Sequence, residues 1–206
     1  MNGFLITFEG TEGSGKSTQI KKAAAHLKAR GWSVLLLREP GGTRVSEAIR
    51  EIILNKKYKE MADSAELLLY LAARAQIVNE KILPALKKGR VVICDRFEDS
   101  TLAYQGYGRG ISVKAIQQVS RLFVRNRLQP QLTILLDVDP KTGLKRGGRH
   151  DRMERQSLLF HKKVRRGFLE LARRNPKRTR VLDARRPIPE IAAQIKGILD
   201  QCLRRK

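Results

Sequence analysis

The chain has 206 residues, of which 41% are hydrophobic, and a formal net charge of +23 at pH 7. That length suits one well-packed core and favours a single domain over residues 1–206, with a hydrophobic share ordinary for a soluble globular protein. The longest apolar stretch, around Leu67 to Ala73, is far too short to span a bilayer, so no membrane partner is expected.

The positive charge is unusually large and unevenly distributed. From Lys145 to Arg186 there are sixteen Lys or Arg residues and four Asp or Glu residues, a net charge of +12. Such a charge suggests polyanionic partners, whether nucleotides, nucleic acid or an acidic surface. We favour an enzyme with a basic solvated exterior over a dedicated nucleic-acid face.

Cysteine and histidine positions bear on the compartment and on metal binding. Cys94 and Cys202 form no C-x-x-C pair or metal spacing, which indicates two free thiols in a reducing compartment. His26, His150 and His161 are too scattered to suggest a metal site. The first strand begins almost at once, with no room for a signal peptide, so we expect a cytoplasmic protein.

The first element is a short apolar, β-rich run, Phe4–Phe8, followed by a glycine-rich loop and a helical pattern over 17–30. The loop fits G-x-x-x-x-G-K-[ST] at every fixed position, in the strand–loop–helix context of a phosphate-binding P-loop. Its backbone N–H groups and the helix N-terminus would hold a phosphate chain, Lys16 would reach the β- and γ-phosphates, and the Ser17 hydroxyl suits Mg²⁺. The sequence therefore predicts a nucleoside triphosphate site made of Gly10, Thr11, Glu12, Gly13, Ser14, Gly15, Lys16, Ser17 and Thr18.

Strands and helices alternate along the rest of the chain. Strands are predicted at 33–37, 90–95, 132–137 and 180–183, and helices at 45–54, 63–82, 100–104, 112–126, 140–147, 154–175 and 189–203. This alternation predicts an α/β, three-layer P-loop fold with a five-stranded parallel sheet flanked by helices. Asp63 or Ser64 is expected to cap the helix at 63–82, and a glycine-rich stretch from Gln105 to Gly110 to interrupt the helix that begins at Ser100. The helix at 45–54 is expected to turn Val45, Ile49, Ile52 and Ile53 inward.

Polar clusters follow the predicted strands. Glu9, Arg38-Glu39, Asp95-Arg96 and Asp137 all stand at strand C-termini, where ligands of such folds bind, so we expect them to converge on one crevice. Asp95 follows four apolar residues, where a P-loop protein places the carboxylate that helps hold Mg²⁺. Arg96 beside it suits bidentate neutralisation of phosphate oxygens.

The sequence near these clusters contains no convincing general base such as a Ser–His or Cys–His pair. Transfer to a monophosphate needs none, because the attacking phosphate oxygen is already ionised near neutral pH. Catalysis then consists of alignment and charge neutralisation, which arginines and Mg²⁺ provide. The segment at about 145–154, with Gly147-Gly148 among arginines, is expected to form a mobile basic lid that closes over the triphosphate.

Four blocks of sequence resemble the thymidylate kinases, P-loop nucleoside monophosphate kinases that phosphorylate dTMP. The blocks are the P-loop, Arg38–Thr43 (REPGGT), Asp95–Gly106 (DRFEDSTLAYQG) and Asp151–Glu154 (DRME); Ala72-Ala73-Arg74 and Leu136-Asp137 agree as well. The resemblance covers essentially the whole chain. It implies ATP as the phosphoryl donor, Mg²⁺ as the cofactor, and conversion of dTMP to dTDP, a step in dTTP synthesis.

The resemblance also implies roles for individual residues. Arg74 would hydrogen-bond the thymine edge, Tyr70 would stack on the ring, and Tyr104 would exclude a ribose 2′-hydroxyl. Arg38 and Arg96 would hold the acceptor phosphate, and Glu9 would face the sugar and phosphate end. The implied dTMP site is Glu9, Arg38, Pro40, Tyr70, Arg74, Arg96, Ser100, Thr101, Tyr104 and Gln105.

Some members of this family carry a catalytic arginine in the P-loop and others supply it from the lid; this chain resembles the second kind, since positions 11, 12 and 14 carry no basic residue. Arg146, Arg149 and Arg152 are the candidates beside Lys16 and Arg96, and Glu12 is expected to pair with one of them. Arg185 falls where the family holds the adenine of ATP. Phe97 stands where tyrosine or histidine is common in the family, so no hydroxyl or imidazole contact is transferred there.

Alternatives remain at this point. The chain is also compatible with a kinase for another pyrimidine monophosphate, such as dUMP, and its charge with a basic P-loop ATPase that acts on nucleic acid. A non-catalytic nucleotide-binding protein is disfavoured by the intact Lys16, Ser17, Asp95 and Arg96. The expected partners are ATP and dTMP, with nucleic acid not expected. Members of the family commonly form homodimers through helices, and the resemblance implies that the helices at 45–54 and 67–82 could supply such an interface here.

Overall fold

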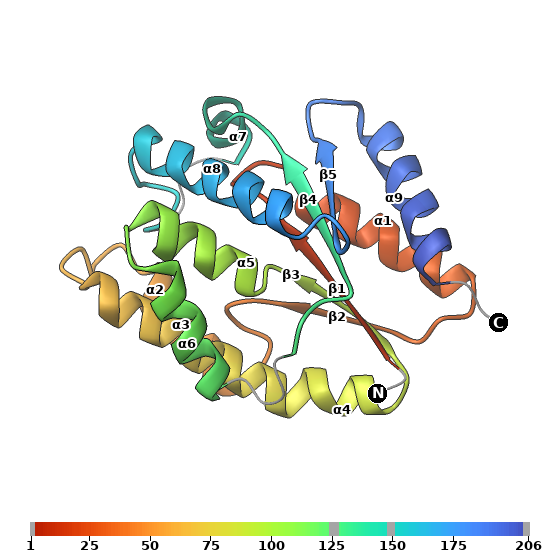
Figure 1. Cartoon of the computed structure of the whole chain (residues 1–206), viewed down its shortest axis with the longest axis horizontal. Coiled ribbons are helices and arrows are strands. Elements are labelled where there is room, and N and C mark those ends of the chain that lie inside the picture. Colours follow the sequence, from red (N-terminus) through yellow and green to blue (C-terminus); the bar gives the residue numbers. More distant parts are fainter. Residues whose placement is uncertain (1–2, 124–127, 148–150, 204–206) are drawn as a thin grey trace.

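The computed structural model describes residues 3–123, 128–147 and 151–203. A five-stranded parallel sheet lies at its centre, in the order β2–β3–β1–β4–β5 (Figure 1). The strands are β1 (Phe4–Glu9), β2 (Val34–Arg38), β3 (Val91–Asp95), β4 (Leu132–Asp137) and β5 (Thr179–Asp183). The expected α/β architecture is confirmed, because all of the strand pairs are parallel and every connection between strands contains a helix.

Helices cover both faces of the sheet (Figure 1). Helices α1 and α9 pack together on one face, α2 to α6 and α8 lie on the opposite side, and α7 lies beyond the carboxyl end of β4 next to the P-loop. Their bounds are α1 (Lys16–Ala29), α2 (Arg44–Leu54), α3 (Asp63–Ile77), α4 (Leu83–Lys87), α5 (Glu98–Thr101), α6 (Val113–Phe123), α7 (Pro140–Gly147), α8 (Leu158–Arg174) and α9 (Ile188–Cys202), with π-helical segments η1 (Val78–Ile82) and η2 (Leu102–Gly108). No helix within the described ranges is long and apolar enough to cross a membrane.

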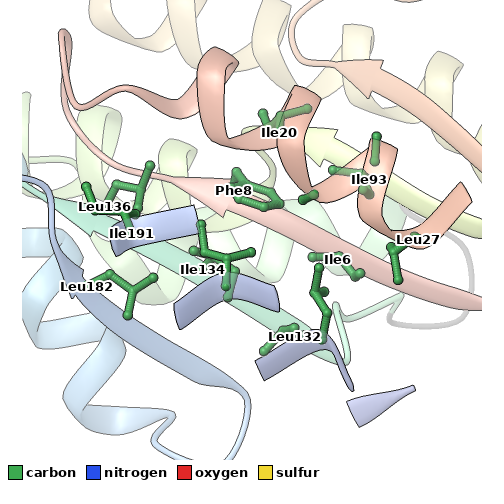
Figure 2. Close-up of a cluster of buried hydrophobic side chains, with 14 of the residues drawn as sticks. Ile6, Phe8, Ile20, Leu27, Ile93, Leu132, Ile134, Leu136, Leu182 and Ile191 are labelled. Atoms are coloured by element: carbon green, nitrogen blue, oxygen red, sulfur yellow. The ribbon is translucent and has the colours of Figure 1, made fainter. Parts of the chain in front are cut away.

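The main hydrophobic core lies between the sheet and the α1–α9 layer (Figure 2). Ile6 and Phe8 of β1, both fully buried, point toward Ile20 and Leu27 of α1, and Ile191 of α9 closes the same layer. The alternate residues of the strands face a second core under α4 and η1. The central strands β1, β3 and β4 are buried on both faces and read as continuous apolar runs, which is why the sequence located them within one or two residues. The outer strands β2 and β5 are partly exposed and were located from their short β-rich runs.

Several boundaries differ from the expectations. The long basic helix begins at Leu158 rather than Glu154, because the Ser157 side chain caps it by accepting the Phe160 N–H at 3.1 Å. The N-cap of α3 is Ala62, without a side-chain cap, rather than Asp63 or Ser64. The helix that contains Ser100 continues past Tyr104 as the π-helical segment η2 and ends at Gly108, so the expected interruption comes at 109–112 rather than at Gln105.

The expected inner face of α2 is only partly correct. Ile53 is fully buried, whereas Val45 and Ile52 are 46% and 41% exposed. The small Ser46 lies inward instead and donates its hydroxyl to the Ala73 carbonyl at 2.9 Å. The helix therefore packs on α3 through small and polar side chains and leaves apolar ones outside.

Candidate active site

The P-loop closes around its own lysine. Lys16 lies at the start of α1 and is buried, and its ammonium group donates to the carbonyls of Gly10 and Thr11 at 3.0 Å each and to the Ser14 hydroxyl at 3.3 Å. Burial, assisted by the nearby Arg96 charge, lowers the pKa of Lys16 to about 8. The ammonium group is thus preorganised beside the loop, in a place where added negative charge would stabilise its protonated form.

Arg96 stands at the centre of the site in a strained backbone conformation. Its φ angle of 69° lies in the left-handed region, which costs a non-glycine residue about 1–3 kcal/mol and is characteristic of functional positions. Its guanidinium donates to the Gly10 carbonyl at 3.0 Å and to Glu12 at 3.0 Å, and its Cζ lies 5.0 Å from the centroid of the Tyr104 ring. Arg96 therefore joins the P-loop to the helical segment that follows β3.

Glu12 of the P-loop is paired differently from the expectation. Its carboxylate accepts the Tyr104 hydroxyl at 2.7 Å and Arg96 at 3.0 Å, and His161 of α8 lies 3.6 Å away. Burial would raise the pKa of Glu12, but the charges of Arg96 and Lys16 outweigh it and the pKa is lowered. The expected pairing with a lid arginine is wrong for Arg146 and Arg152; Arg149 lies outside the described residues.

A second buried charge pair stands on the acceptor side. Arg74 of α3 donates to Glu39 at 2.7 Å with both side chains almost inaccessible, and its guanidinium lies 5.2 Å from the centroid of the Phe97 ring. The Nη1 atom of Arg74 is buried and has no hydrogen-bond partner among the described atoms. A fixed guanidinium with a spare donor at the cavity suits recognition of a ligand carbonyl.

Both clusters open into one cavity of about 280 Å³. Most of the predicted residues line it: Glu12, Gly13, Lys16, Ser17, Arg38, Pro40, Tyr70, Arg74, Asp95, Arg96, Ser100, Thr101, Tyr104 and Gln105. The strand register explains this convergence, since Asp95 lies directly opposite both Arg38 and Phe8 at the carboxyl edge of the sheet. The other P-loop positions are not in the lining; they form the loop backbone and the start of α1, and are Gly10, Thr11, Ser14, Gly15 and Thr18.

Two of the strand-end carboxylates do not join this cavity. Glu9 is 1% exposed; it accepts the Phe97 N–H at 2.8 Å and the Ser100 hydroxyl, and burial together with the charge of Asp99 raises its pKa. Asp137 forms a two-point ion pair with Arg165 of α8 instead, at 2.7 and 2.8 Å. The expected single crevice is therefore wrong for these two positions.

Three of the arginines that were predicted to act in catalysis or ATP binding are held by protein groups. Arg146 at the end of α7 donates to the Ala184 carbonyl at 3.0 Å, and Arg185 forms an exposed ion pair with Asp183 at 2.8 Å. Arg152 is buried and donates to the Ile53 carbonyl at 2.8 Å and to Glu66 at 2.6 Å. Their predicted roles toward ATP stay predictions.

The cavity also contains residues that were not predicted as site residues. They are Glu39, which was expected at the crevice but was given no binding role, and Arg50, Leu54, Asp151, Met153 and Glu154. Glu39 stands inside the REPGGT block and its carboxylate pairs with Arg74, so the block itself was the available signal. Arg50 of α2 donates to the Pro40 carbonyl at 2.8 Å, and no local sequence pattern predicts this contact.

The metal-binding prediction rests on two oxygen donors. Ser17 is exposed at the start of α1 and Asp95 ends β3, and both line the cavity. Within the described ranges, no group of three or more His, Cys, Asp or Glu side chains forms a metal cage. One hydroxyl and one carboxylate fit Mg²⁺, which takes most of its ligands from phosphates and water.

Comparisons with known proteins identify the family of the chain. The family model described as thymidylate kinase matches residues 8–195. The chain is 47% identical to the thymidylate kinase of Geobacillus sp. (strain WCH70), with 98% of each chain covered, and 52% identical to that of Pelotomaculum thermopropionicum, with 90% and 88% covered. The crystal structure of thymidylate kinase from Ehrlichia chaffeensis matches with a TM-score of 0.79 and 35% identity, over 96% of this chain and 98% of that one. The chain belongs to the thymidylate kinase family.

Proposed function

We propose that the cavity binds ATP and dTMP together and that the chain transfers the γ-phosphoryl group of ATP to the phosphate of dTMP, giving ADP and dTDP. The single observation that carries this proposal is the placement of Arg96. One guanidinium touches the P-loop through Gly10 and Glu12 and the acceptor wall through Ser100. A donor phosphate on the P-loop and an acceptor phosphate at Arg38 would thus meet at the same cation.

The mechanism needs no general base. The attacking oxygen of dTMP is already anionic, so the protein supplies alignment and charge neutralisation. Lys16 holds the β- and γ-phosphates, Arg96 bridges donor and acceptor, and Arg38 holds the acceptor phosphate. Ser17 and Asp95 would hold Mg²⁺, which supplies further charge neutralisation on the phosphates when it is bound.

Recognition of the acceptor depends on the cavity wall opposite the P-loop, which α3 and η2 supply. The spare Nη1 donor of Arg74 faces a thymine carbonyl, and Tyr70, one helical turn earlier on α3, stacks on the ring. Tyr104, which Glu12 fixes through its hydroxyl, stands where a ribose 2′-hydroxyl would lie. The wall therefore selects a deoxyribonucleotide that bears a pyrimidine.

Among the lid arginines, Arg152 is committed to Glu66 and the Ile53 carbonyl. We therefore assign the contact with the transferring phosphate to Arg146 or Arg149. Arg185 would lie along the adenine after release from Asp183. Two free cysteines support a reducing, cytoplasmic location, and the partners are the nucleotides rather than nucleic acid.

The test of this function is the variant Arg96→Ala. Loss of a preorganised cation at the transferring group should lower kcat by about 10²–10³-fold, while the Kd for ATP, measured by calorimetry, stays near that of the wild type. Arg166→Ala, on the exposed face of α8, is the matched control and should keep full activity. Preserved transfer with a lost ATP affinity would contradict the role of Arg96.

A further inference from the structure

Behind the acceptor wall, one carboxylate gathers three donors from different parts of the chain. Glu66 of α3 is fully buried and accepts Gln105 at 2.9 Å, Arg109 at 3.2 and 2.9 Å, and Arg152 at 2.6 Å. Both of its oxygens are thus saturated. Nothing in the proposed chemistry uses this residue.

Each of these connections leads toward the cavity. Gln105 lines the cavity directly, and Tyr70 follows Glu66 by one turn of the same helix. Arg152 stands between Asp151 and Met153, which line the cavity from the C-terminal base of the lid segment. Glu66 therefore lies where the acceptor helix, the segment η2 and the lid base meet.

Arg152 is fastened to α2 as well as to Glu66. Its side chain donates to the Ile53 carbonyl at 2.8 Å, and its backbone N–H donates to the Leu54 carbonyl at 3.1 Å. Asp151 then accepts the backbone N–H groups of Met153 at 2.8 Å and Glu154 at 2.9 Å. The turn is therefore rigid once Arg152 is in place.

Charge makes the arrangement specific. Burial would raise the pKa of Glu66, but hydrogen bonds from Arg109 and Gln105 and the charges of Arg109 and Arg152 outweigh it and lower the pKa. Arg109 has a second carboxylate, Asp63, at 3.2 Å, whereas the carboxylate that the structure shows for Arg152 is Glu66. A neutral residue at 66 would leave the buried positive charge of Arg152 without a carboxylate partner. Because a buried unpaired charge is destabilising, we expect the Arg152 side chain to leave its present position.

We propose that Glu66 is a positioning residue for the acceptor: through Arg152 and Gln105 it holds the Asp151–Glu154 turn and η2 against the dTMP end of the cavity. This inference rests on the proposed function, since it concerns the acceptor half of the same site. It assigns Arg152 to anchoring the lid base rather than to the transferring phosphate. The P-loop makes none of these contacts with Glu66 and Arg152 and meets η2 at Tyr104, so the larger effect of Glu66 falls on the acceptor.

Steady-state kinetics of Glu66→Gln test the proposal. Glutamine keeps the shape and the acceptor for Gln105 but turns N–H donors toward Arg152. We expect the KM for dTMP to rise about 10-fold or more while the KM for ATP changes less than about threefold. Glu170→Gln is the control, because Glu170 also accepts from two arginines but lies on the exposed side of α8.

The pair with Arg152 separates positioning from general destabilisation. If Glu66 acts through Arg152, Arg152→Gln raises the dTMP KM in the same way, and the double variant is no worse than the more severe single one. Arg152→Lys, which keeps the charge, should recover part of the loss. A kcat fall in Arg152→Gln at unchanged dTMP KM, additive effects, or equal changes in both KM values would overturn the proposal.

Thermal unfolding and the activity of the wild-type protein on dTMP distinguish a folding defect, a failure of the proposed function and a failure of this inference. Thermal unfolding of each variant reports folding, and should Glu66→Gln fail to fold, the Arg152 variants carry the same comparison. Wild-type protein inactive on dTMP would instead refute the proposed function. Wild-type activity together with an unaltered dTMP KM in Glu66→Gln would overturn the inference alone.

Discussion

Lys16 shows how a single residue is prepared for its ligand. In the closed P-loop its ammonium group makes three hydrogen bonds to the protein, and desolvation and Arg96 lower its pKa to about 8. In the proposed function, a bound triphosphate would replace these partners with anionic oxygens and favour the protonated amine. The free loop therefore holds a lysine with a lowered pKa, and this lysine would take up a proton when the phosphates bind.

Lys16 makes ATP binding pH-dependent. More of the free amine is neutral at pH 8.5 than at pH 7, so ATP binding should take up more protons at pH 8.5 than at pH 7. Calorimetry in two buffers of different ionisation enthalpy measures this number. In Lys16→Arg, whose guanidinium stays charged, the uptake should vanish. Proton release, or no uptake, at pH 8.5 would contradict the account.

At the scale of elements, the P-loop depends on a close approach to α7. A Cβ atom added at Gly13 would lie 1.9 Å from the Gly143 carbonyl oxygen, and one added at Gly143 would lie 2.2 Å from the Glu12 carbonyl oxygen. Gly13 also has a φ angle of 63°, which a residue with a side chain rarely adopts. Helix α7, which leads into the lid segment, is therefore packed directly against the phosphate loop at Gly143.

The variant Gly143→Ala tests this fit. The added methyl group must push α7 away from the P-loop, which should lower kcat/KM for ATP about 10-fold or more and the free energy of unfolding by about 1–3 kcal/mol. Gly197→Ala in α9 is the control, because its Cβ would meet no described atom within 4 Å. That change should leave activity intact and raise stability by up to about 1 kcal/mol. Equal behaviour of the two variants would disprove the fit.

The helices and strands differ in how well the sequence predicts their position and their buried face. The P-loop and the five strands were predictable because their signals are local: a fixed spacing of glycines, or a short run of apolar, β-rich residues. Periodicity in α2 named an apolar face but not its surroundings, so Val45 and Ile52 were placed inside although they are exposed. The Glu66–Arg152 contact joins residues 86 positions apart, and nothing near either residue points to the other.

At the scale of the whole molecule, apolar side chains remain exposed on α2, α3 and α6. Leu68 is 57% exposed on α3, Val45 and Ile52 are exposed on α2, and Phe123 is 59% exposed at the end of α6. Helix α3 packs against both of its neighbours. We propose that this side of the molecule forms the homodimer interface.

A single charge on that side tests the dimer. Leu68→Glu should halve the mass measured by light scattering, because a buried unpaired carboxylate is costly in an interface. Leu159→Glu is the matched control, since Leu159 is 63% exposed on α8, away from α2 and α3. A monomeric wild type, or a dimer that persists in Leu68→Glu, would contradict the proposed interface.

The most direct test of the whole account is a coupled assay of ADP release with ATP and Mg²⁺. It compares dTMP, dUMP, UMP and AMP as acceptors, with buffer alone and DNA as the remaining conditions. The account predicts turnover with dTMP well above that with UMP, AMP, buffer or DNA, because the roles proposed for Arg74, Tyr70 and Tyr104 select a pyrimidine deoxyribonucleotide; the dUMP arm measures selection for the thymine methyl group. ADP release stimulated by DNA but not by dTMP would contradict it and direct attention to the basic surface.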